Sequence, residues 1–445
     1  MPAPGAATAP ELSSSASVRA VLITFAASGF AFASWASRLP AVRDGLGYSE
    51  GQMGLLLLTA AIGSVLAIPL SGLFVERLGT RRTVVLFASV LLVGVVVAVG
   101  GVTLDESVAV RIGLLLFGVG SGVWDAGMNL EGAAVEQRLG RAVMPHFHAA
   151  FSFGTVVGAG IGALAARFGV PIQWHVSVAA TLSLVAVLYA VRSFLPAAVR
   201  AGMVPAPHPP SGHEVEDPQA DPASTLGTTA PAPAPAPAAD AAPTGTRGLL
   251  AAWREPRTLA VGLVVLGAAL TEGVANDWVS LAVVDGFDVA DEVGALGLAV
   301  FLTAMTTGRL LGTRTIDRFG RVPVLRVSAL LAIVGVAMFA LVPSLWAALV
   351  GVALWGVGAA LGFPVGMSAA SDEPARAPMR VAVVSTIGYS AFFVGPPLIG
   401  FLAEHTGYRL AVLVLALPVV LGLVVAGSAR PLPTAAGGAP TTLER

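Results

Sequence analysis

The sequence predicts an all-α membrane protein, with twelve transmembrane helices in two pseudo-symmetric six-helix bundles. Three observations lead to this fold class. The 445-residue chain is 56% hydrophobic and 11% charged, with a mean hydropathy of +0.83, whereas soluble domains are about 25% charged. Its long apolar runs form two groups of six, separated by a polar, proline-rich stretch. A similar short signature follows the second run of each group.

Each apolar run can cross a bilayer, because a helix rises about 1.5 Å per residue and the hydrocarbon core is about 30 Å thick. Residues 1–17 are small and polar and lack the positive charge of a secretory signal, so we predict a disordered N-terminus and a first helix that is retained. The predicted spans are 18–40, 52–75, 83–101, 108–132, 147–168, 173–195, 258–283, 293–313, 322–342, 344–367, 380–403 and 408–428.

A polar segment, residues 197–247, separates the two groups of spans and contains the run PAPAPAP at 231–237. It has scattered acids and no helical period of apolar residues, so we predict a disordered cytoplasmic linker with polyproline character. The two bundles then comprise residues 18–196 and 248–430, and residues 431–445 form a disordered tail.

Arginines are concentrated on one side of the predicted membrane. With both termini in the cytoplasm, the inner loops hold Arg77, Arg81, Arg82, Arg138, Arg141, Arg314, Arg318, Arg321, Arg376 and Arg380. The outer loops hold mainly the acids Asp105, Glu106, Asp285, Asp288, Asp291 and Glu292, with Arg43 as the clearest basic residue. The positive-inside rule favours this topology. We therefore expect a multi-pass protein of the plasma membrane, the bacterial inner membrane, with cytoplasmic termini.

The two signatures occupy equivalent loops of the two halves. Residues 72–82 read GLFVERLGTRR and residues 312–321 read GTRTIDRFGR. In both, an acid and an arginine precede an apolar residue, a glycine and another arginine. A second match pairs LLLFGVG at 114–120 with VALWGVG at 352–358. Parallel repeats of this kind place a substrate site between the halves, near the middle of the membrane.

These features resemble the major facilitator superfamily (MFS) of transporters over nearly the whole chain outside the termini and the linker. The resemblance implies an MFS fold whose halves rock about a central site. In that family the signature resembles a conformational latch, whose acid meets a helix end and arginines of the same half and favours the outward-facing state. Carried over, the latch residues are Glu76, Arg77, Arg81 and Arg82 in the first half and Asp317, Arg318 and Arg321 in the second.

A narrower resemblance concerns the fourth and fifth spans, which contain GSGVWDAGMN at 120–129 and FHAAFSFG at 147–154. Both segments are similar to the fucose-permease-like branch of the family, in which the acid of the fourth span belongs to the sugar and proton machinery. The first span departs from that branch, because Ala36 stands four residues before Pro40 where the branch carries an acid. Uncharacterised bacterial inner-membrane relatives of the branch resemble the chain more closely, and they identify no substrate.

Asp125 and Glu272 are the leading candidates for proton coupling. A charge at the centre of a membrane helix costs about 2.5–3.5 kcal/mol, so such residues face a cavity, pair or move protons. Asn129 and Asn276 follow these acids at i,i+4 and share their helix faces. The alternatives are that Asp125 pairs with an arginine, and that Glu272 is a protonated structural residue.

Asp277 and Arg38 fall at similar depths in the seventh and first spans, which face each other across the cavity in this fold. We predict that they form an external gate or an anion-recognition site; the alternative is that Arg38 extends to the outer headgroups. His148 enters the fifth span and suits a proton relay, although it also fits an interfacial position. Glu131, near the inner surface, is expected to be a loop-facing salt-bridge partner.

Aromatic residues fall on the helices expected to line the cavity, where a ring face suits the apolar face of a sugar or a hydrophobic drug. Packing within the bundle is the alternative for each of them. They are Trp35, Trp124, Trp278, Trp355, Phe363 and Tyr389.

Several functional classes are excluded by what the sequence lacks. It has no phosphate-binding GxxxxGK[ST] loop, no HExxH motif and no cysteine, and its net charge is −1. We expect no enzyme, no cofactor or metal, and no nucleic-acid partner.

Together these observations predict a monomeric secondary transporter in the lipid bilayer, which moves a small organic solute together with protons. A sugar-like, hydroxylated solute is favoured by the polar, aromatic residues and by the fourth span. Two alternatives remain: proton-antiport efflux of amphipathic compounds or drugs, and a non-transporting membrane sensor that uses the linker as an output arm.

Overall fold

The computed structural model describes residues 14–139, 143–195, 245–373 and 376–432. These residues form helices joined by short turns, and no strand occurs in the described ranges. The first half contains α1 (Ser14–Ala36), α2 (Leu39–Leu46), α3 (Glu50–Ala67), η1 (Ile68–Leu70), α4 (Ser71–Thr103), α5 (Ser107–Leu139), α6 (Met144–Arg167), α7 (Ile172–Ala190) and η2 (Val191–Ser193). The second half contains α9 (Gly245–Arg254), α10 (Pro256–Phe287), α11 (Asp291–Phe319), α12 (Arg321–Leu341), α13 (Leu345–Ala359), α14 (Gly362–Ala370), α15 (Ala377–Thr406), α16 (Tyr408–Ala411), η3 (Val412–Leu415), α17 (Ala416–Val425) and η4 (Ala426–Ala429).

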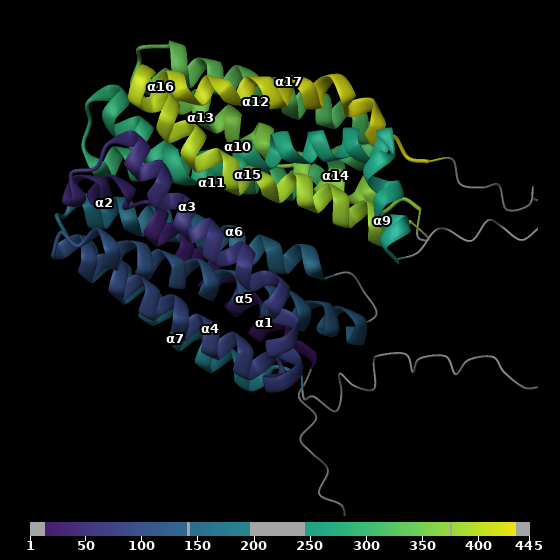
Figure 1. The fold of residues 1–445 in the computed structure, drawn as a ribbon, viewed down its shortest axis with the longest axis horizontal. Helices are drawn as coiled ribbons and strands as arrows, with labels where there is room; N and C mark the ends of the chain where they lie inside the picture. Colours follow the sequence, from purple (N-terminus) through teal and green to yellow (C-terminus); the bar gives the residue numbers. More distant parts are fainter. Residues whose placement is uncertain (1–13, 140–142, 196–244, 374–375, 433–445) are drawn as a thin grey trace, which may run out of the picture.

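The helices form two bundles that lie side by side, with the long helices running along the long axis of the molecule (Figure 1). Packing is repeated between the halves: α1 packs on α6 as α10 packs on α15, and α4 packs on α5 as α12 packs on α13. The halves meet mainly where α3 packs on α15 and α6 packs on α11. The predicted all-α membrane fold is confirmed.

Within the residues that the structure describes, eleven helical segments are long and apolar enough to cross a membrane. One of them, Glu50–Thr103, has 54 residues, more than twice the roughly 20 that one crossing needs. It contains two of the predicted spans, and its backbone leaves the helical region at Gly79 (φ 77°, ψ 156°), inside the first signature. Twelve crossings require this segment to supply two of them, and that count stays a prediction.

Two prolines divide helices that the sequence predicts as continuous. The predicted first span breaks at Ser37 and Arg38, before α2, which has Pro40 in its first turn. The predicted tenth span breaks between α13 and α14, where Pro364 lies within the first turn of α14. Proline has no N–H, so it leaves the carbonyl four residues earlier without its helical partner. For Pro364 that carbonyl belongs to Ala360, which is used by the site described below.

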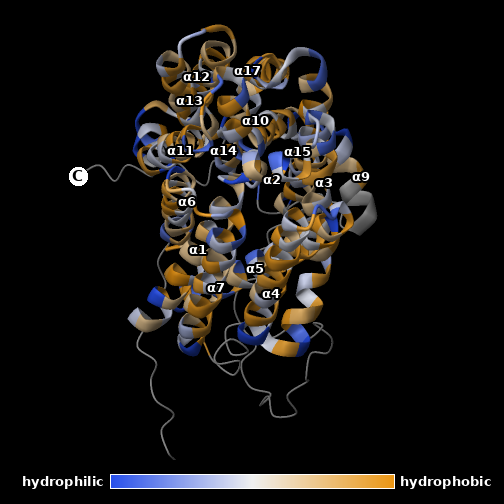
Figure 2. Ribbon diagram, turned by 90° about the vertical axis from the view of Figure 1, so that its left-hand side faces the viewer, coloured by the Kyte–Doolittle hydropathy of each residue, from blue (hydrophilic) through white to orange (hydrophobic). Residues whose placement is uncertain are grey.

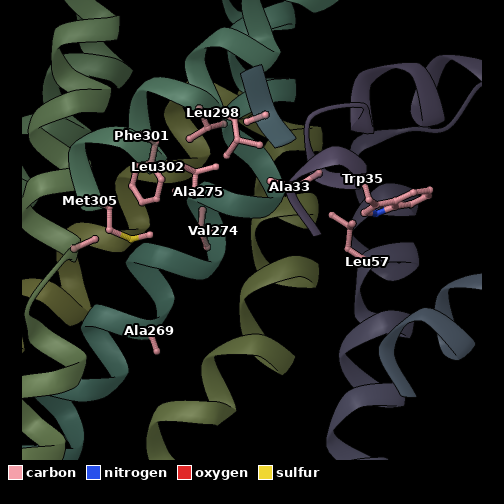
Figure 3. Packing of buried hydrophobic residues seen from close by; sticks show 14 of the residues in the cluster. Ala33, Trp35, Leu57, Ala269, Val274, Ala275, Leu298, Phe301, Leu302 and Met305 are labelled. Atoms are coloured by element: carbon pink, nitrogen blue, oxygen red, sulfur yellow. The ribbon is translucent and has the colours of Figure 1, made fainter. Parts of the chain in front are cut away.

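The interior of each half is packed with alanine, valine and large apolar side chains (Figure 3). Phe301 and Met305 lie on one side of α11 and point into the core of the second half. Exposed apolar side chains such as Leu182 and Val185 cover the outside of the bundles. Figure 2 shows apolar residues along the helices, with hydrophilic residues gathered at turns and helix ends. This distribution suits a molecule whose long sides face lipid.

Some predicted boundaries differ from the structure. The first helix begins at Ser14, inside the segment predicted as disordered up to residue 17, and Ser17 is already buried. Helix α9 begins at Gly245, inside the predicted linker, because a short amphipathic segment precedes α10. Most of the predicted linker, residues 196–244, and the tail from residue 433 lie outside the described residues.

Candidate functional site

Asp125 lies near the middle of α5 and is enclosed by protein, yet its side chain is exposed. A residue that is surrounded by protein but still exposed lines an internal space. Asn129, one turn later, donates from its side-chain amide to the backbone carbonyl of Asp125 at 2.9 Å and also interacts with the carboxylate. The two residues therefore share a face, as their spacing predicts.

Tyr389 on α15 faces this position from the other half. It is 48% exposed, and the charge of Asp125 acts on its hydroxyl group. Phe363 and Phe392 lie beside it, with ring centroids 6.0 and 6.2 Å from that of Tyr389. The space between the halves thus has a carboxylate on one wall and an aromatic hydroxyl on the other.

Glu272, in the middle of α10, forms an ion pair with Arg309 of α11 (Nη2 to Oε2, 2.7 Å). Arg309 also donates from Nε to the carbonyl of Ala360 at 3.3 Å, the acceptor released by Pro364. Both charged side chains are partly exposed, at 23% for Glu272 and 30% for Arg309. The sequence analysis did not identify Arg309, although a charged residue inside the predicted span 293–313 is itself a sign of a functional position.

His148, in the first turns of α6, is exposed and lies within the electrostatic reach of Arg309 from the other half. Its ring packs edge-on against Phe25 at a centroid distance of 5.3 Å. The polar residues named so far come from α5, α6, α10, α11 and α15, so both halves contribute to one region.

The tryptophans do not line this region. Trp124 and Trp278 are fully buried, and Trp35 is 4% exposed. Trp35 packs near Phe117, and Trp278 packs against Tyr408 with ring centroids 5.4 Å apart. The expectation that these residues stack on a solute is wrong for this conformation, because the rotation of their helices directs the indoles into the bundle cores.

Trp355 is likewise fully buried, and its Nε1 donates to the carbonyl of Thr271 at 3.1 Å. Of the aromatic candidates, Tyr389 is exposed and Phe363 is partly exposed. The aromatic lining of the site is therefore narrower than the sequence predicts.

The predicted Arg38–Asp277 pair is not formed. Arg38 is buried in the turn before α2, and its Nη2 donates to the carbonyl of Val170 in its own half at 3.0 Å. Asp277 is half-buried on α10, and Asn276 beside it is also half-buried. The turn between α1 and α2 places Arg38 beside Val170 and within electrostatic reach of Asp291 of α11 rather than beside Asp277, which explains the difference.

A different arginine joins the halves at this end. Arg43 of α2 forms an ion pair with Asp285 near the end of α10. Ser49, which caps α3, donates from Oγ to Oε1 of Glu404 on α15 at 2.8 Å. Ser280 donates to the carbonyl of Ala36 at 3.3 Å. We call this set of contacts the α2-end gate.

Close backbone packing supports the α2-end gate. A Cβ atom on Gly54 of α3 would lie 2.6 Å from the carbonyl oxygen of Pro396, and one on Gly400 would lie 2.7 Å from that of Glu50. Contacts this short leave no room for a side chain, so α3 and α15 approach closely because both positions are glycine.

The first predicted latch is not engaged in this conformation. Glu76, Arg77, Arg81 and Arg82 are exposed, and none of them has a hydrogen bond or ion pair in the part of the chain that the structure describes. Gly79 turns the backbone between the acid and the last two arginines, which separates the groups that the latch would join.

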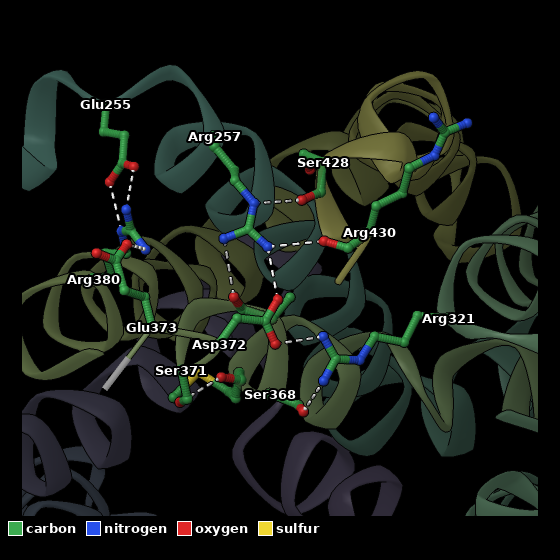
Figure 4. Close-up of polar contacts among 12 residues, drawn as sticks. Glu255, Arg257, Arg321, Ser368, Ser371, Asp372, Glu373, Arg380, Ser428 and Arg430 are labelled. Carbon is green, nitrogen blue, oxygen red and sulfur yellow. Dashed lines mark hydrogen bonds and ion pairs between the residues drawn. The ribbon is translucent and has the colours of Figure 1, made fainter. Parts of the chain in front are cut away.

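The second signature contributes one residue, Arg321, to a charged network at the end of the molecule opposite α2 (Figure 4). Its Nη1 binds Asp372 at 2.7 Å, and Arg257 binds the other oxygen of Asp372 at 2.8 Å. Arg257 also donates to the carbonyls of Ser428 and Arg430. The acid that holds Arg321 is thus Asp372, which follows α14, and not Asp317 as the signature predicts.

The remaining signature residues of the second half, Asp317 and Arg318, are exposed. The guanidinium carbon of Arg318 lies 5.2 Å from the centre of the Phe319 ring.

A second part of the network joins α10 to α15. Glu255 accepts two hydrogen bonds from the buried Arg380, at 2.7 and 2.6 Å. Burial raises the pKa of the Glu255 carboxyl, but hydrogen bonds from Arg380 and Thr258 outweigh it and hold the pKa below its usual value. Glu373 lies 3.0 Å from Nη1 of Arg380 without hydrogen-bond alignment.

Glu131 is fully buried, and it accepts a hydrogen bond at 2.5 Å from the amide of Leu195, in the non-helical segment that follows η2. Glu131 therefore faces the loop at the end of the first half from a buried position. Glu131 ties the end of α5 to the end of the first half, as Asp372 and Arg257 tie α14 to the end of the second. These acids stabilise each bundle near the same end of the molecule.

Two partly open pockets lie elsewhere. One, of about 180 Å³, is lined by apolar side chains that include Leu270, Ile399 and Leu417. A smaller one, of about 40 Å³, lies between α10, α12, α13, α14 and α17. Neither has Asp125, Glu272 or Tyr389 in its lining, so the open region between the halves is the better candidate for a polar solute.

Solved structures of transporters share this fold. The nucleoside transporter NupG has a TM-score of 0.67 at 14% identity, covering 93% of this chain and 98% of its own. The D-xylose–proton symporter has a TM-score of 0.64 at 14% identity, covering 93% and 96%. The E. coli fucose–proton symporter FucP has a TM-score of 0.52 at 16% identity, covering 92% and 99%.

Sequence relatives cover nearly the whole chain. An uncharacterized MFS-type transporter of Yersinia pestis is 29% identical over 425 residues, which are 95% of this chain and 97% of that protein. An uncharacterized transporter of Sinorhizobium fredii is 30% identical over 410 residues, 92% of this chain and 97% of that protein. The model of the Major Facilitator Superfamily matches residues 20–290 and 262–445. With its paired bundles and many apolar helices, the chain is therefore a multi-pass membrane transporter, not an enzyme, and belongs to the Major Facilitator Superfamily.

Proposed function

We propose that the protein couples protons to the uptake of a small, hydroxylated organic solute by alternating access. The observation that carries this proposal is the position of Asp125, an exposed carboxylate deep inside α5 that faces Tyr389 from the other half. An ionisable group inside a membrane helix is costly and marks an ion or substrate pathway.

The residues around Asp125 suit a solute that carries several hydroxyl groups. Asn129 and Tyr389 each offer a donor and an acceptor, and the ring of Tyr389 offers an apolar face. In this proposal Asp125 binds a proton and a solute hydroxyl in one state and releases both in the other. Sugar and nucleoside transport by the structural neighbours supports this substrate class.

Glu272 and Arg309 have a different role in the proposal. Because they neutralise each other, they add hydrogen-bonding groups to the region without net charge. Of the two leading candidates, Asp125 is then the acid whose charge changes during transport. In this proposal His148, which lies within the electrostatic reach of Arg309, relays a proton between this region and the end of the molecule opposite α2.

Alternating access is supported by the distribution of contacts. The α2-end gate joins the halves at one end, while Asp125 is exposed to the space between them. With both termini in the cytoplasm, as the arginines predict, this state is open to the cytoplasm. The solute is then released inward, and the gate must open for outward loading.

Purified protein in liposomes with an internal pH dye tests the proposal. Sugars, polyols, organic acids and amphipathic cations are added outside in turn. A symported solute acidifies the interior, and Asp125→Asn abolishes the acidification while the protein keeps its fold. Asp105→Asn is the matched control, because it makes the same change at an exposed turn residue.

Two results contradict the proposal. If an added solute makes the interior alkaline, the protein exchanges protons for solute, and efflux of amphipathic compounds replaces uptake. If Asp125→Asn transports solute with undiminished acidification, Asp125 does not carry the proton.

A further inference from the structure

Helix α9 has an exposed face that the transport site does not use. It is a separate ten-residue helix, because Glu255 between α9 and α10 has an extended backbone (φ −79°, ψ 114°). Figure 1 shows α9 running across the direction of the long helices. The end of α9 lies one residue before Pro256, where the candidate membrane span of α10 begins.

The two faces of α9 differ. Ala252 is 6% exposed, and α9 packs on α15 and α10. Leu250 and Trp253 are 53% and 38% exposed, and Arg254 is also exposed. Residues at i, i+3 and i+4 share one side of a helix, so the exposed face combines two large apolar side chains with a basic one.

This combination is typical of helices that lie in the membrane interface. Tryptophan and leucine enter the boundary between headgroups and acyl chains, and arginine binds phosphate on the headgroup side. We propose that α9 is a membrane-surface helix that binds anionic phospholipid headgroups, with Leu250 and Trp253 in the interface and Arg254 at the phosphates. A lipid is favoured over a protein partner because α9 lies at the start of a spanning helix.

The contacts of α9 connect the proposed lipid site with the helix that carries Tyr389. Glu255, directly after α9, is held by Arg380 of α15 through two hydrogen bonds. Tyr389 of the candidate site lies further along the same helix. Anionic lipid that holds α9 to the surface therefore also holds the first turns of α15. The proposal concerns lipid binding and stands whichever solute is carried.

The absence of cysteine from the chain makes the test direct. A spin label is attached to Leu250→Cys or Trp253→Cys, and the protein is reconstituted in phosphatidylcholine with or without phosphatidylglycerol. Asp105→Cys, in an exposed turn, is the water-exposed control. Collisions of the label with oxygen and with a water-soluble nickel complex report its depth.

We expect the labels at 250 and 253 to favour oxygen and the label at 105 to favour the nickel complex. Phosphatidylglycerol strengthens this preference. Arg254→Gln weakens the apparent affinity for phosphatidylglycerol roughly fivefold, because one basic residue near an anionic surface contributes about that much to binding. Labels at 250 and 253 that are as accessible to nickel as the control overturn the proposal. So do labels shielded from both reagents, which indicate a protein cover, and labels in the interface that ignore phosphatidylglycerol and Arg254→Gln.

Discussion

Asp125 and Glu272 are both carboxylates in the interior of a membrane helix, but their neighbours differ. Glu272 is paired with Arg309, whereas Asp125 has an amide and, across the gap, a phenol. The two members of an ion pair compensate each other's charge, so removing one member leaves the charge of the other unpaired. The two acids therefore respond differently to neutralisation.

We predict that Glu272→Gln and Arg309→Gln each destabilise the protein by about 1–3 kcal/mol, because each leaves one charge unpaired in a partly exposed site. The double variant should lose less than the sum of the two single variants. Thermal unfolding in detergent, analysed as a double-mutant cycle, measures this coupling. Additive losses would show that the ion pair contributes nothing to stability.

At the scale of helices, glycine and proline determine which elements can approach. Gly54 and Gly400 let α3 and α15 touch at the α2-end gate. Pro364 ends the helical ladder at Ala360 and frees the carbonyl that Arg309 uses. The close approach of α3 to α15 and the break between α13 and α14 therefore depend on a few uncharged residues.

Gly54→Val should prevent α3 and α15 from closing and favour the state that is open at the α2 end, because its Cβ would lie 2.6 Å from the carbonyl oxygen of Pro396. We expect Ser280→Cys, buried at this gate, to react faster with a membrane-impermeant maleimide in the Gly54→Val protein. Gly160→Val is the control, since nothing lies within 4 Å of its Cβ position. Equal labelling in both backgrounds would contradict the gating role of α3.

The Glu255–Arg380 contact predicts how stability depends on pH. The pKa of Glu255 is lowered on folding, so the contact stabilises the protein above the unfolded-state pKa, and this contribution is lost as the pH falls through the folded-state value. We expect the wild-type melting temperature to fall more steeply below about pH 4.3 than that of Glu255→Gln. Glu106→Gln, at an exposed residue, should retain the wild-type profile; a Glu255→Gln profile parallel to wild type would contradict the prediction.

For the whole molecule, the position of the polar contacts between the halves determines which end is closed. Arg43, Ser49 and Ser280 join the halves near α2, whereas the network of Arg257, Asp372 and Arg321 lies within the second half. The first contacts must break when the halves rock, and the second can move as a rigid unit. This division suits alternating access between two ends.

Reversing one charge of the gate, by Arg43→Asp or Asp285→Arg, should shift the protein toward the state that is open at the α2 end and slow transport. Reversing both should restore most of the transport, because the ion pair forms again with its charges exchanged. Initial uptake rates in liposomes measure the effect. A double variant as slow as either single one would show that Arg43 and Asp285 act independently, and the same exchange at Arg38 and Asp277 should give no rescue.

The sequence alone determined the class of the molecule and the location of its central acid. Hydropathy and length identified the membrane helices, the paired signatures at 72–82 and 312–321 identified two related halves, and the spacing of Asp125 and Asn129 placed them on one face. These properties are local or periodic, so they can be read without knowledge of which helices touch.

The tertiary structure decided the partners. In the structure Glu272 pairs with Arg309, and Arg321 pairs with Asp372. The ion pair between the halves is made by Arg43 and not by Arg38, and the tryptophans of the predicted lining are buried in the bundle cores. Each of these outcomes depends on how far a helix is rotated and where a proline or a turn redirects it. Such angles are determined by the packing of all neighbouring helices together, which is why no single segment of the sequence contains them.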